Sequence, residues 1–173
     1  AGRPLGAAEV ALELGGFVGF TAARMAQSAA GRAHAPAGGC HGPRVVSVEK
    51  NSGCAQLSRA FLAHAGLAPL AEVWTGRSGD VLPRVLEECG RGAVGFAFFD
   101  HSGSVYHEDL WALERLRLLA PGAVLVADNV LKPGAPLFLW HVLQSPAYDL
   151  ELVSVREFAQ RRTEDWLAVC TAR

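Results

Sequence analysis

The feature that most constrains the fold is a regular alternation of short apolar runs with longer amphipathic stretches. Seven runs rich in Val, Leu, Ala and Phe each have the length of a single β-strand. They are EVALELG, RVVSVEK, AEVWTG, GFAFFD, AVLVADN, YDLELVSV and DWLAVCTA, at residues 9–15, 44–50, 71–76, 95–100, 123–129, 148–155 and 165–172. The stretches between the first five runs have the spacing of amphipathic helices, at residues 19–30, 52–65, 79–90 and 106–119.

This alternation predicts an α/β protein with a doubly wound, mostly parallel sheet of seven strands. Strands that are apolar along their whole length are typical of a parallel sheet covered on both faces by helices. A short helix is expected at residues 136–144, and the last two runs are joined by the polar segment REFAQRRTED (156–165). We expect these last two strands to pair antiparallel at one edge of the sheet.

Composition narrows the classes of function. The chain has 173 residues and a formal net charge of −1, which gives no electrostatic reason to expect nucleic acid or an anionic membrane as partner. No apolar run approaches the roughly 18 residues of a membrane span. The four cysteines form no C-x-x-C pair, which favours free thiols over disulfides or a zinc site. We therefore expect a monomeric single domain over residues 1–173 that acts on a small molecule. The expected location is the cytoplasm, and the alternative is a membrane anchor in an N-terminal segment that this sequence lacks.

The end of the first run carries a glycine-rich turn. Ligands of doubly wound sheets bind beyond the carboxyl ends of the strands, and here the sequence is ELGGFVGFT, with Glu13, Gly15 and Gly19 in the pattern E-x-G-x-x-x-G. Glycines let the backbone turn tightly and approach a ligand closely. The pattern differs from the dinucleotide fingerprint, and the chain has no G-K-[ST] phosphate loop, which disfavours NAD and ATP. The alternative is that this glycine-rich turn is only a tight strand–helix connection.

Polar residues also end the next two runs. Glu49 ends the second, and a carboxylate there offers two adjacent oxygens that can accept both hydroxyls of a ribose. Ser78 and Asp80 follow the third run, where they can contact a ligand or simply cap the next helix.

Oxygen-bearing side chains end the fourth and fifth runs, at Asp100 and at Asp128–Asn129. In the predicted sheet these two strands are neighbours, so the three side chains converge at one edge. Hard oxygen ligands without thiolates suit Mg²⁺. The alternative is that Asp100 caps a helix and that Asp128 and Asn129 form a turn.

Five stretches together resemble a known family. ALELGGFVGFTAARMA, VEKN, FFDH, LLAPGAVLVADNV and PGAP resemble, in order and spacing, the catechol O-methyltransferase family, including its transmembrane-type paralogue. The resemblance runs from about residue 9 to the end of the chain. It implies a Rossmann-like methyltransferase fold, S-adenosylmethionine and Mg²⁺ as cofactors, and methylation of one hydroxyl of a catechol. Since the family has helices before its first strand, the chain is expected to be N-terminally truncated and to lack them.

The resemblance also assigns roles to individual residues. It implies that the metal is bound by Asp100, Asp128 and Asn129. It implies cofactor contacts at Glu13, Gly15, Phe17, Thr21, Glu49, Lys50, Ser78, Asp100 and His101, with Glu49 on the ribose and with Ser78 and His101 beside the adenine.

Three positions depart from the family pattern or match it loosely. The family follows its metal-binding Asp-His with Trp-Lys, where the lysine is the general base, but this chain has Ser102 and Gly103. Lys132 lies three residues beyond Asn129, and we hypothesise that it is a displaced base; the alternative is an exposed loop lysine. The resemblance places Lys132 and Pro133 at the substrate entrance, and Glu157 is the nearest match to the glutamate that orients the catechol.

The leading interpretation is a Mg²⁺- and S-adenosylmethionine-dependent O-methyltransferase for a catechol-like small molecule. One alternative is an enzyme for another vicinal diol, such as a caffeoyl or flavonoid compound. The other is a weak or inactive relative that acts as a cofactor-binding or partner-docking module.

Overall fold

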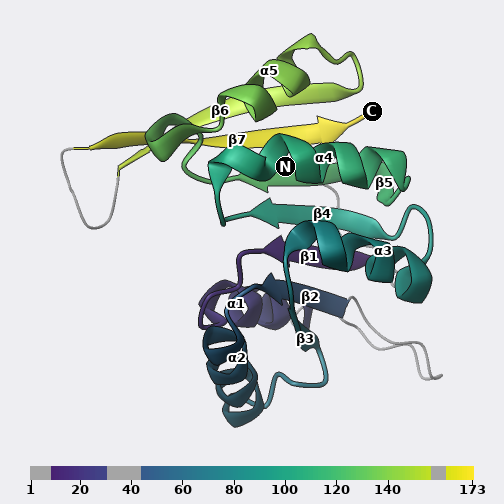
Figure 1. Cartoon of the computed structure of the whole chain (residues 1–173), viewed down its shortest axis with the longest axis vertical. Helices are drawn as coiled ribbons and strands as arrows, with labels where there is room; N and C mark the ends of the chain where they lie inside the picture. The colour runs from purple at the N-terminus through teal and green to yellow at the C-terminus, as the bar shows by residue number, and fades with distance from the viewer. Residues whose placement is uncertain (1–8, 31–43, 157–162) are drawn as a thin grey trace.

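The computed structural model describes residues 9–30, 44–156 and 163–173. The strands form one seven-stranded sheet in the order β3-β2-β1-β4-β5-β7-β6 (Figure 1). Their bounds are Val10–Leu14 (β1), Arg44–Glu49 (β2), Ala71–Thr75 (β3), Val94–Phe99 (β4), Leu119–Ala127 (β5), Tyr148–Arg156 (β6) and Glu164–Ala172 (β7).

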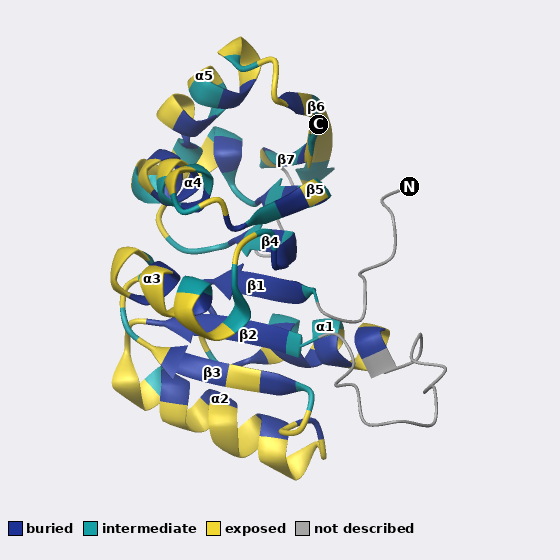
Figure 2. Ribbon diagram, turned by 90° about the vertical axis from the view of Figure 1, so that its right-hand side faces the viewer, coloured by how far each residue is buried: buried dark blue, intermediate teal, exposed yellow. Residues whose placement is uncertain are grey.

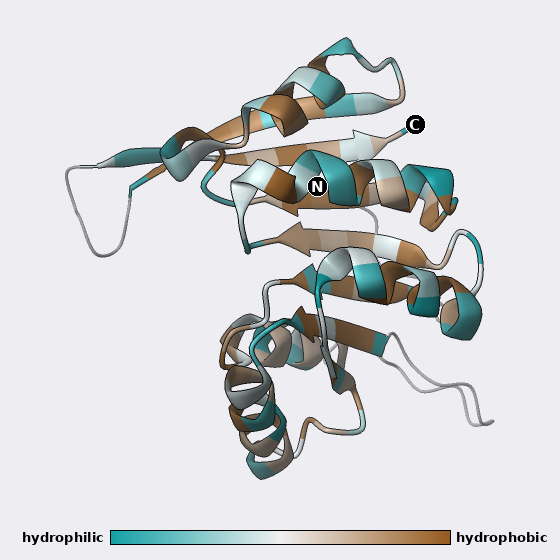
Figure 3. Cartoon of the chain, viewed as in Figure 1, coloured by the Kyte–Doolittle hydropathy of each residue, from teal (hydrophilic) through white to brown (hydrophobic). Residues whose placement is uncertain are grey.

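The strand directions confirm the predicted fold class. The first five strands pair in parallel, and β7 pairs antiparallel with both β5 and β6. The antiparallel pair therefore stands at one edge as expected, with β7 one position in and β6 outermost. The interior of each strand is dominated by apolar residues, as Figure 3 shows by colour.

Helices cover the sheet from both sides. They are α1 (Phe20–Ala30), α2 (Ser52–His64), α3 (Ser78–Cys89), α4 (Tyr106–Arg115) and α5 (Pro136–Gln144), with the short turns η1 (Gly103–Val105) and η2 (Val130–Gly134). The helices α3, α4 and α5 lie on one face, and α1 and α2 lie on the other over β1 to β3 (Figures 1 and 2). None of the helices in the described ranges is both long and apolar enough to cross a membrane.

The two faces of the sheet are covered unequally. Leu12 and Leu125 belong to the large core under α3, α4 and α5 and are fully buried. On the opposite face, α1 and α2 bury a smaller, alanine-rich core around the first three strands. Phe98, Val124 and Val126 also point to that face, farther along the sheet, and are only half-buried. Within the described ranges, the second helix layer thus covers one half of the sheet more fully than the other.

The fourth helix is shorter than the 106–119 stretch expected from the sequence. It ends at Arg115, and Arg117 takes the left-handed conformation with φ 54°. The amide of Leu118 then donates to the carbonyl of Leu113 at 2.9 Å, a typical helix C-terminal motif. Leu118 is fully buried beyond this turn, so core packing ends the helix and starts β5 at Leu119.

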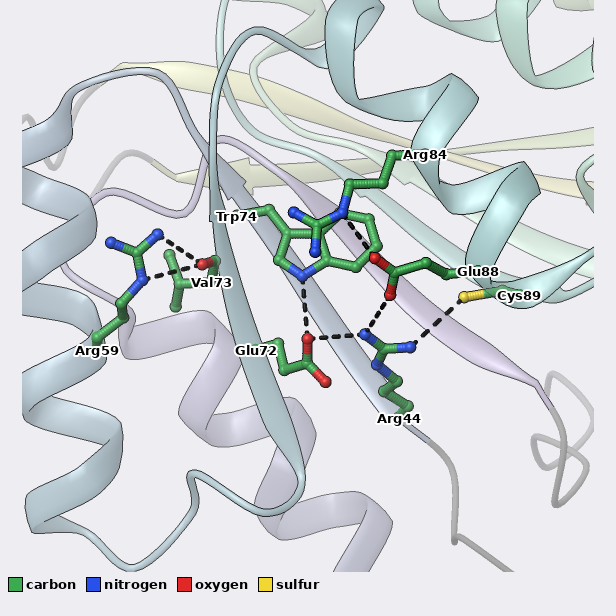
Figure 4. Close-up of polar contacts among 8 residues, drawn as sticks. All are labelled: Arg44, Arg59, Glu72, Val73, Trp74, Arg84, Glu88 and Cys89. Carbon is green, nitrogen blue, oxygen red and sulfur yellow. Dashed lines mark hydrogen bonds and ion pairs between the residues drawn. The ribbon is translucent and has the colours of Figure 1, made fainter.

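The free edge of the sheet at β3 is occupied by charged side chains. Arg59 of α2 donates from Nε and Nη2 to the carbonyl of Val73, at 3.1 and 2.8 Å (Figure 4). The Arg84 guanidinium lies 4.0 Å from the centroid of the Trp74 ring. Because an exposed strand edge is a template for pairing with another chain, an arginine on its carbonyl blocks such pairing.

Candidate active site

The parallel register brings three strand ends together at one edge of the sheet. Leu14 of β1 pairs with Phe99 of β4, which pairs with Ala127 of β5. The amide of Asp100 donates to the carbonyl of Leu14, and the amide of Asp128 donates to the carbonyl of Phe99, each at 2.9 Å. The predicted adjacency of the fourth and fifth strand ends is therefore confirmed.

The glycine turn after β1 allows a close backbone contact that a side chain would prevent. Gly15 has φ +107°, and a Cβ atom there would lie 2.3 Å from the carbonyl oxygen of Asp100. Gly19 has φ +88°, and a Cβ atom would lie 2.3 Å from the hydroxyl of Ser58 in α2. The turn is thus packed against β4 on one side and against α2 on the other, which fixes its path past the strand ends.

Glu13 is buried one residue before the end of β1, only 1% exposed. Its carboxylate accepts hydrogen bonds from the hydroxyls of Ser47 and Thr21. Burial, opposed by Ser47 and reinforced by the charges of Asp100 and Glu49, raises its pKa from 4.5 to about 7. The predicted cofactor residues Glu13 and Thr21 are therefore in contact with each other.

Glu49 ties the end of β2 to the glycine turn. Its Oε2 accepts from the amide of Phe17 at 2.9 Å, and its Oε1 accepts from the amide of Asn51 at 2.7 Å. Each carboxylate oxygen can accept more than one hydrogen bond, so both oxygens keep capacity for a ligand hydroxyl. The Phe17 side chain is exposed, as is Lys50.

Asp100 and Asp128 form a pair of carboxylates with raised pKa values. Burial and the charge of Asp128, opposed by His101, raise the pKa of Asp100 to about 6. Burial also raises the pKa of Asp128, with the amide of Asn129 opposing it and the charge of Asp165 adding to it. Each carboxylate thus feels the negative charge of the other or of a neighbour, which a bound cation would relieve.

Asn129 and Asp165 are joined by a hydrogen bond that sequence reasoning missed. Asn129 has the left-handed conformation with φ 55°, and its Nδ2 donates to Oδ2 of Asp165 at 3.0 Å. Asp165 is 1% exposed and lies near the start of β7. Burial would raise its pKa, but its hydrogen bonds outweigh burial and lower the pKa. The only signal in the sequence was an acid at the start of an otherwise apolar strand.

The residues expected beside the adenine lie at two separate elements. The Nε2 atom of His101 is 2.7 Å from Oδ2 of Asp109, and its ring centroid is 5.0 Å from that of Tyr106. Ser78 is the first residue of α3, whose N-cap is Arg77, without a side-chain capping hydrogen bond. Ser78 is therefore not the cap of this helix.

Gly103 occupies the position where the family carries its lysine, and it is buried against η2. A Cβ atom at Gly103 would lie 2.4 Å from the carbonyl oxygen of Gly134 and 3.3 Å from the Cβ atom of Ala135. Backbone cannot yield to such a contact as a flexible side chain can. The path of the chain after Asn129 therefore fills the space that a longer side chain at 103 would require.

The predicted substrate residues Lys132 and Pro133 are exposed in η2. The pKa of Glu164 is lowered by hydrogen bonds from Trp166 and Ser154 and, to a smaller extent, by the charge of Lys132. Glu157 lies outside the described residues.

Among the described residues, no three side chains of His, Cys, Asp or Glu form a metal-binding group. The candidate set differs in composition, since it contains two carboxylates, Asp100 and Asp128, and the amide of Asn129. Because Nδ2 of Asn129 donates to Asp165, its Oδ1 remains available as an acceptor. This donor set is the kind of oxygen set that suits a hard divalent cation.

Comparison with known proteins identifies the class. Residues 12–130 match the family described as "Methyltransferase domain", and the chain belongs to this methyltransferase family. The catechol O-methyltransferases of Bos taurus and Sus scrofa are 36% and 35% identical to it over 133 residues, 77% of this chain. These matches cover 45% of the bovine and 66% of the porcine protein, so the chain spans about half to two thirds of their length.

More distant relatives agree with this assignment. The transmembrane O-methyltransferase homolog of Mus musculus is 32% identical over 142 residues, 82% of this chain and 51% of that protein. The O-methyltransferase from Bacillus cereus, solved in complex with SAH, has the same fold, with a TM-score of 0.77, 22% identity, and coverage of 95% of this chain and 74% of its own. The resemblance to the catechol O-methyltransferase family is confirmed.

Substitution of Glu13 should change how stability depends on pH. Its carboxyl keeps a proton up to about pH 7 when folded but loses it near pH 4.5 when unfolded. The folded state thus binds more protons in this window, and the free energy of unfolding falls as pH rises through it. We expect Glu13→Gln to reduce this fall, leaving the part that the raised pKa of Asp100 contributes up to about pH 6, and to be more stable than the wild type at pH 8, by on the order of 1–3 kcal/mol.

Urea unfolding at pH 5, 6, 7 and 8 measures this effect. Glu87→Gln, which changes an exposed carboxyl of α3, is the control. If the stability of Glu13→Gln declines with pH as steeply as that of the wild type, Glu13 is not the group responsible.

Returning a lysine to position 103 should destabilise the protein. We expect Gly103→Lys to lower the free energy of unfolding by about 1–3 kcal/mol, because the new side chain overlaps the backbone of Gly134. The control is Gly79→Lys, where a Cβ atom meets no atom within 4 Å. Urea unfolding compares the two, and equal stabilities would contradict the packing described for Gly103.

Proposed function

We propose that the chain catalyses the transfer of a methyl group from S-adenosylmethionine to a hydroxyl of a catechol-like small molecule, with the help of Mg²⁺. The observation that carries this proposal is the set of carboxylates at the carboxyl ends of adjacent strands. Burial and mutual repulsion raise the pKa values of Glu13, Asp100 and Asp128. Such a site favours cationic ligands, and both the sulfonium cofactor and a divalent metal are cations.

The cofactor would lie across the ends of β1, β2 and β4. Glu49 would accept the ribose hydroxyls, since backbone amides already fix both of its oxygens in place. Glu13, Gly15, Phe17 and Thr21 would lie along the methionine end. The remaining cofactor contacts proposed from the family resemblance are Lys50, Ser78, Asp100 and His101. Orientation of the methyl group toward the acceptor oxygen is the main contribution that such contacts can make.

The metal would be held by Asp100, Asp128 and Oδ1 of Asn129. A divalent cation there supplies charge that lowers the pKa of a substrate hydroxyl. The chain's own contribution is to hold three oxygens at the ends of two paired strands, with the Asn129 amide hydrogen-bonded to Asp165. A divalent cation can bind both oxygens of a vicinal diol, which supports catechols and, equally, caffeoyl or flavonoid compounds.

One observation favours the alternative of a weak or inactive relative. The family's lysine position is Gly103, and its surroundings leave no room for a side chain. Fast turnover therefore depends on another proton acceptor, for which Lys132 is the candidate, and a binding module would need none.

Calorimetry with S-adenosylmethionine and Mg²⁺, followed by a methylation assay, separates these functions. We expect the cofactor to bind without metal, catechol to bind only when both cofactor and Mg²⁺ are present, and mass spectrometry to detect the methylated catechol. Parallel titrations with a caffeoyl compound rank the substrates. Cofactor binding without metal-dependent catechol binding would leave the binding-module function instead.

Lys132→Ala tests the displaced base. Lys132 is exposed, and its charge acts on Glu164, which supports the interpretation of an ordinary loop lysine. We therefore expect kcat to change by less than about threefold between pH 6 and 9, well below the roughly 100-fold that a general base contributes. A roughly 100-fold loss of kcat that disappears at high pH would instead assign the base to Lys132. Arg156→Ala, at the exposed end of β6, is the control for loss of a nearby positive charge.

A further inference from the structure

Asp165 is a buried carboxylate that is held by hydrogen bonds and to which the family resemblance assigned no role. Its Oδ1 accepts from the backbone amides of Leu131, Lys132 and Trp166, at 3.2, 3.1 and 2.7 Å. Its Oδ2 accepts from the side-chain amide of Asn129 at 3.0 Å. Two of the four donors belong to the segment that follows the candidate metal ligands, and a third is Asn129, one of those ligands. Asp165 therefore attaches this segment, which follows β5, to the neighbouring strand β7.

The two oxygens of Asp165 have different tasks. Oδ1 fixes the backbone of η2, which shapes the loop. Oδ2 fixes the amide group of Asn129, and this contact decides which end of the amide faces the candidate metal site. An ionised carboxylate is an acceptor only, so it must face the NH₂ end of Asn129. The oxygen of the same amide is then left to face the other way, and only an oxygen can be a ligand for Mg²⁺.

The geometry points to Asp165 as the positioning residue of the metal site: we propose that it orients Asn129 so that Oδ1 is presented to the divalent cation. This inference rests on the proposed function, because it requires that Asn129 is a ligand. Residues that orient metal ligands in this way typically contribute about 10–100-fold to metal affinity.

Asp165→Asn separates the orienting contact from the anchoring contact. The new side chain keeps one oxygen for the three backbone amides, so the loop keeps its anchor. Its NH₂ group would face the NH₂ group of Asn129, and two donors cannot pair. Asn129 must then turn its amide over, which replaces the oxygen ligand with a nitrogen that carries two protons. We expect the affinity for Mn²⁺ to fall by about 10–100-fold, and that for S-adenosylmethionine without metal to change by less than about twofold.

A double substitution gives a rescue. In Asn129→Asp combined with Asp165→Asn, the amide and the carboxylate exchange places, so a donor again faces an acceptor and one carboxylate oxygen remains for the cation. We expect this variant to bind Mn²⁺ more tightly than Asp165→Asn alone. The control is Asp149→Asn at the start of β6. It removes an exposed carboxylate on the same pair of strands, β6 and β7, and this carboxylate forms an ion pair with Arg173.

The measurement is a titration with Mn²⁺, with the free ion followed by its electron paramagnetic resonance signal and the heat followed by calorimetry. Circular dichroism and thermal unfolding check that each variant is folded. Loss of affinity in Asp165→Asn with recovery in the double variant supports the positioning role. Equal affinity of Asp165→Asn and the wild type overturns this role and leaves the proposed function standing. Loss without recovery, together with loss of cofactor affinity, also overturns it, because Asp165 is then only structural.

Two further outcomes complete the test. A wild type that binds no Mn²⁺ overturns both the positioning role and the metal dependence of the proposed function. If Asp165→Asn does not fold, nuclear magnetic resonance of the wild type decides. The Asn129 side-chain amide protons should then stay protected from exchange by Asp165 when Mg²⁺ is added, and loss of that protection overturns the inference.

Discussion

The parallel pairing of β1, β4 and β5 is the constraint on which the candidate site depends. In this register Leu14, Phe99 and Ala127 are in line, so the residues that follow them leave the sheet side by side. Gly15 lies against the backbone of Asp100 because it has no Cβ atom. A slip of one residue in either pair would turn one acid away from the other. The chemistry at this edge is therefore a consequence of strand register, which apolar packing on the faces of the sheet maintains.

Neighbouring carboxylates at this edge have opposite electrostatic characters. Asp100 and Asp128 are partly buried next to negative charge, and their pKa values are raised. Asp165 is more deeply buried, but four N–H donors hold its pKa low. In Asp165 the hydrogen bonds to the charged form outweigh the cost of burial, whereas burial is the largest cause of the raised pKa values of Asp100 and Asp128. Asp165 is thus held by four donors of the protein, whereas Asp128 accepts from the amide of Asn129 and keeps a raised pKa.

Much of this arrangement was predictable from the sequence. The strand runs and their order along the chain indicated the sheet, and the acids at the run ends indicated the edge where the acidic side chains of the candidate site gather. The contacts that depend on residues distant in sequence could not be predicted in this way. Asn129 and Asp165 are 36 positions apart, and their hydrogen bond exists only because β7 inserts between β5 and β6. The early end of α4 was missed for a similar reason, because the packing of Leu118 outweighs a helical pattern that continues in the sequence.

The unequal covering of the two sheet faces has a consequence for motion. The strands β1, β2 and β3 lie between two helix layers, whereas Phe98, Val124 and Val126 are half-buried on the thinly covered face. Strands with fewer buried contacts open at a lower free-energy cost, so amide exchange should be fastest toward β6 and slowest in β1 and β2. The Glu13 and Glu49 side of the site is built on strands between two helix layers, and the segment after β5 follows a strand that is half-buried on one face in the described ranges. Such a division would let one ligand dock on a fixed platform while the other half adjusts around it.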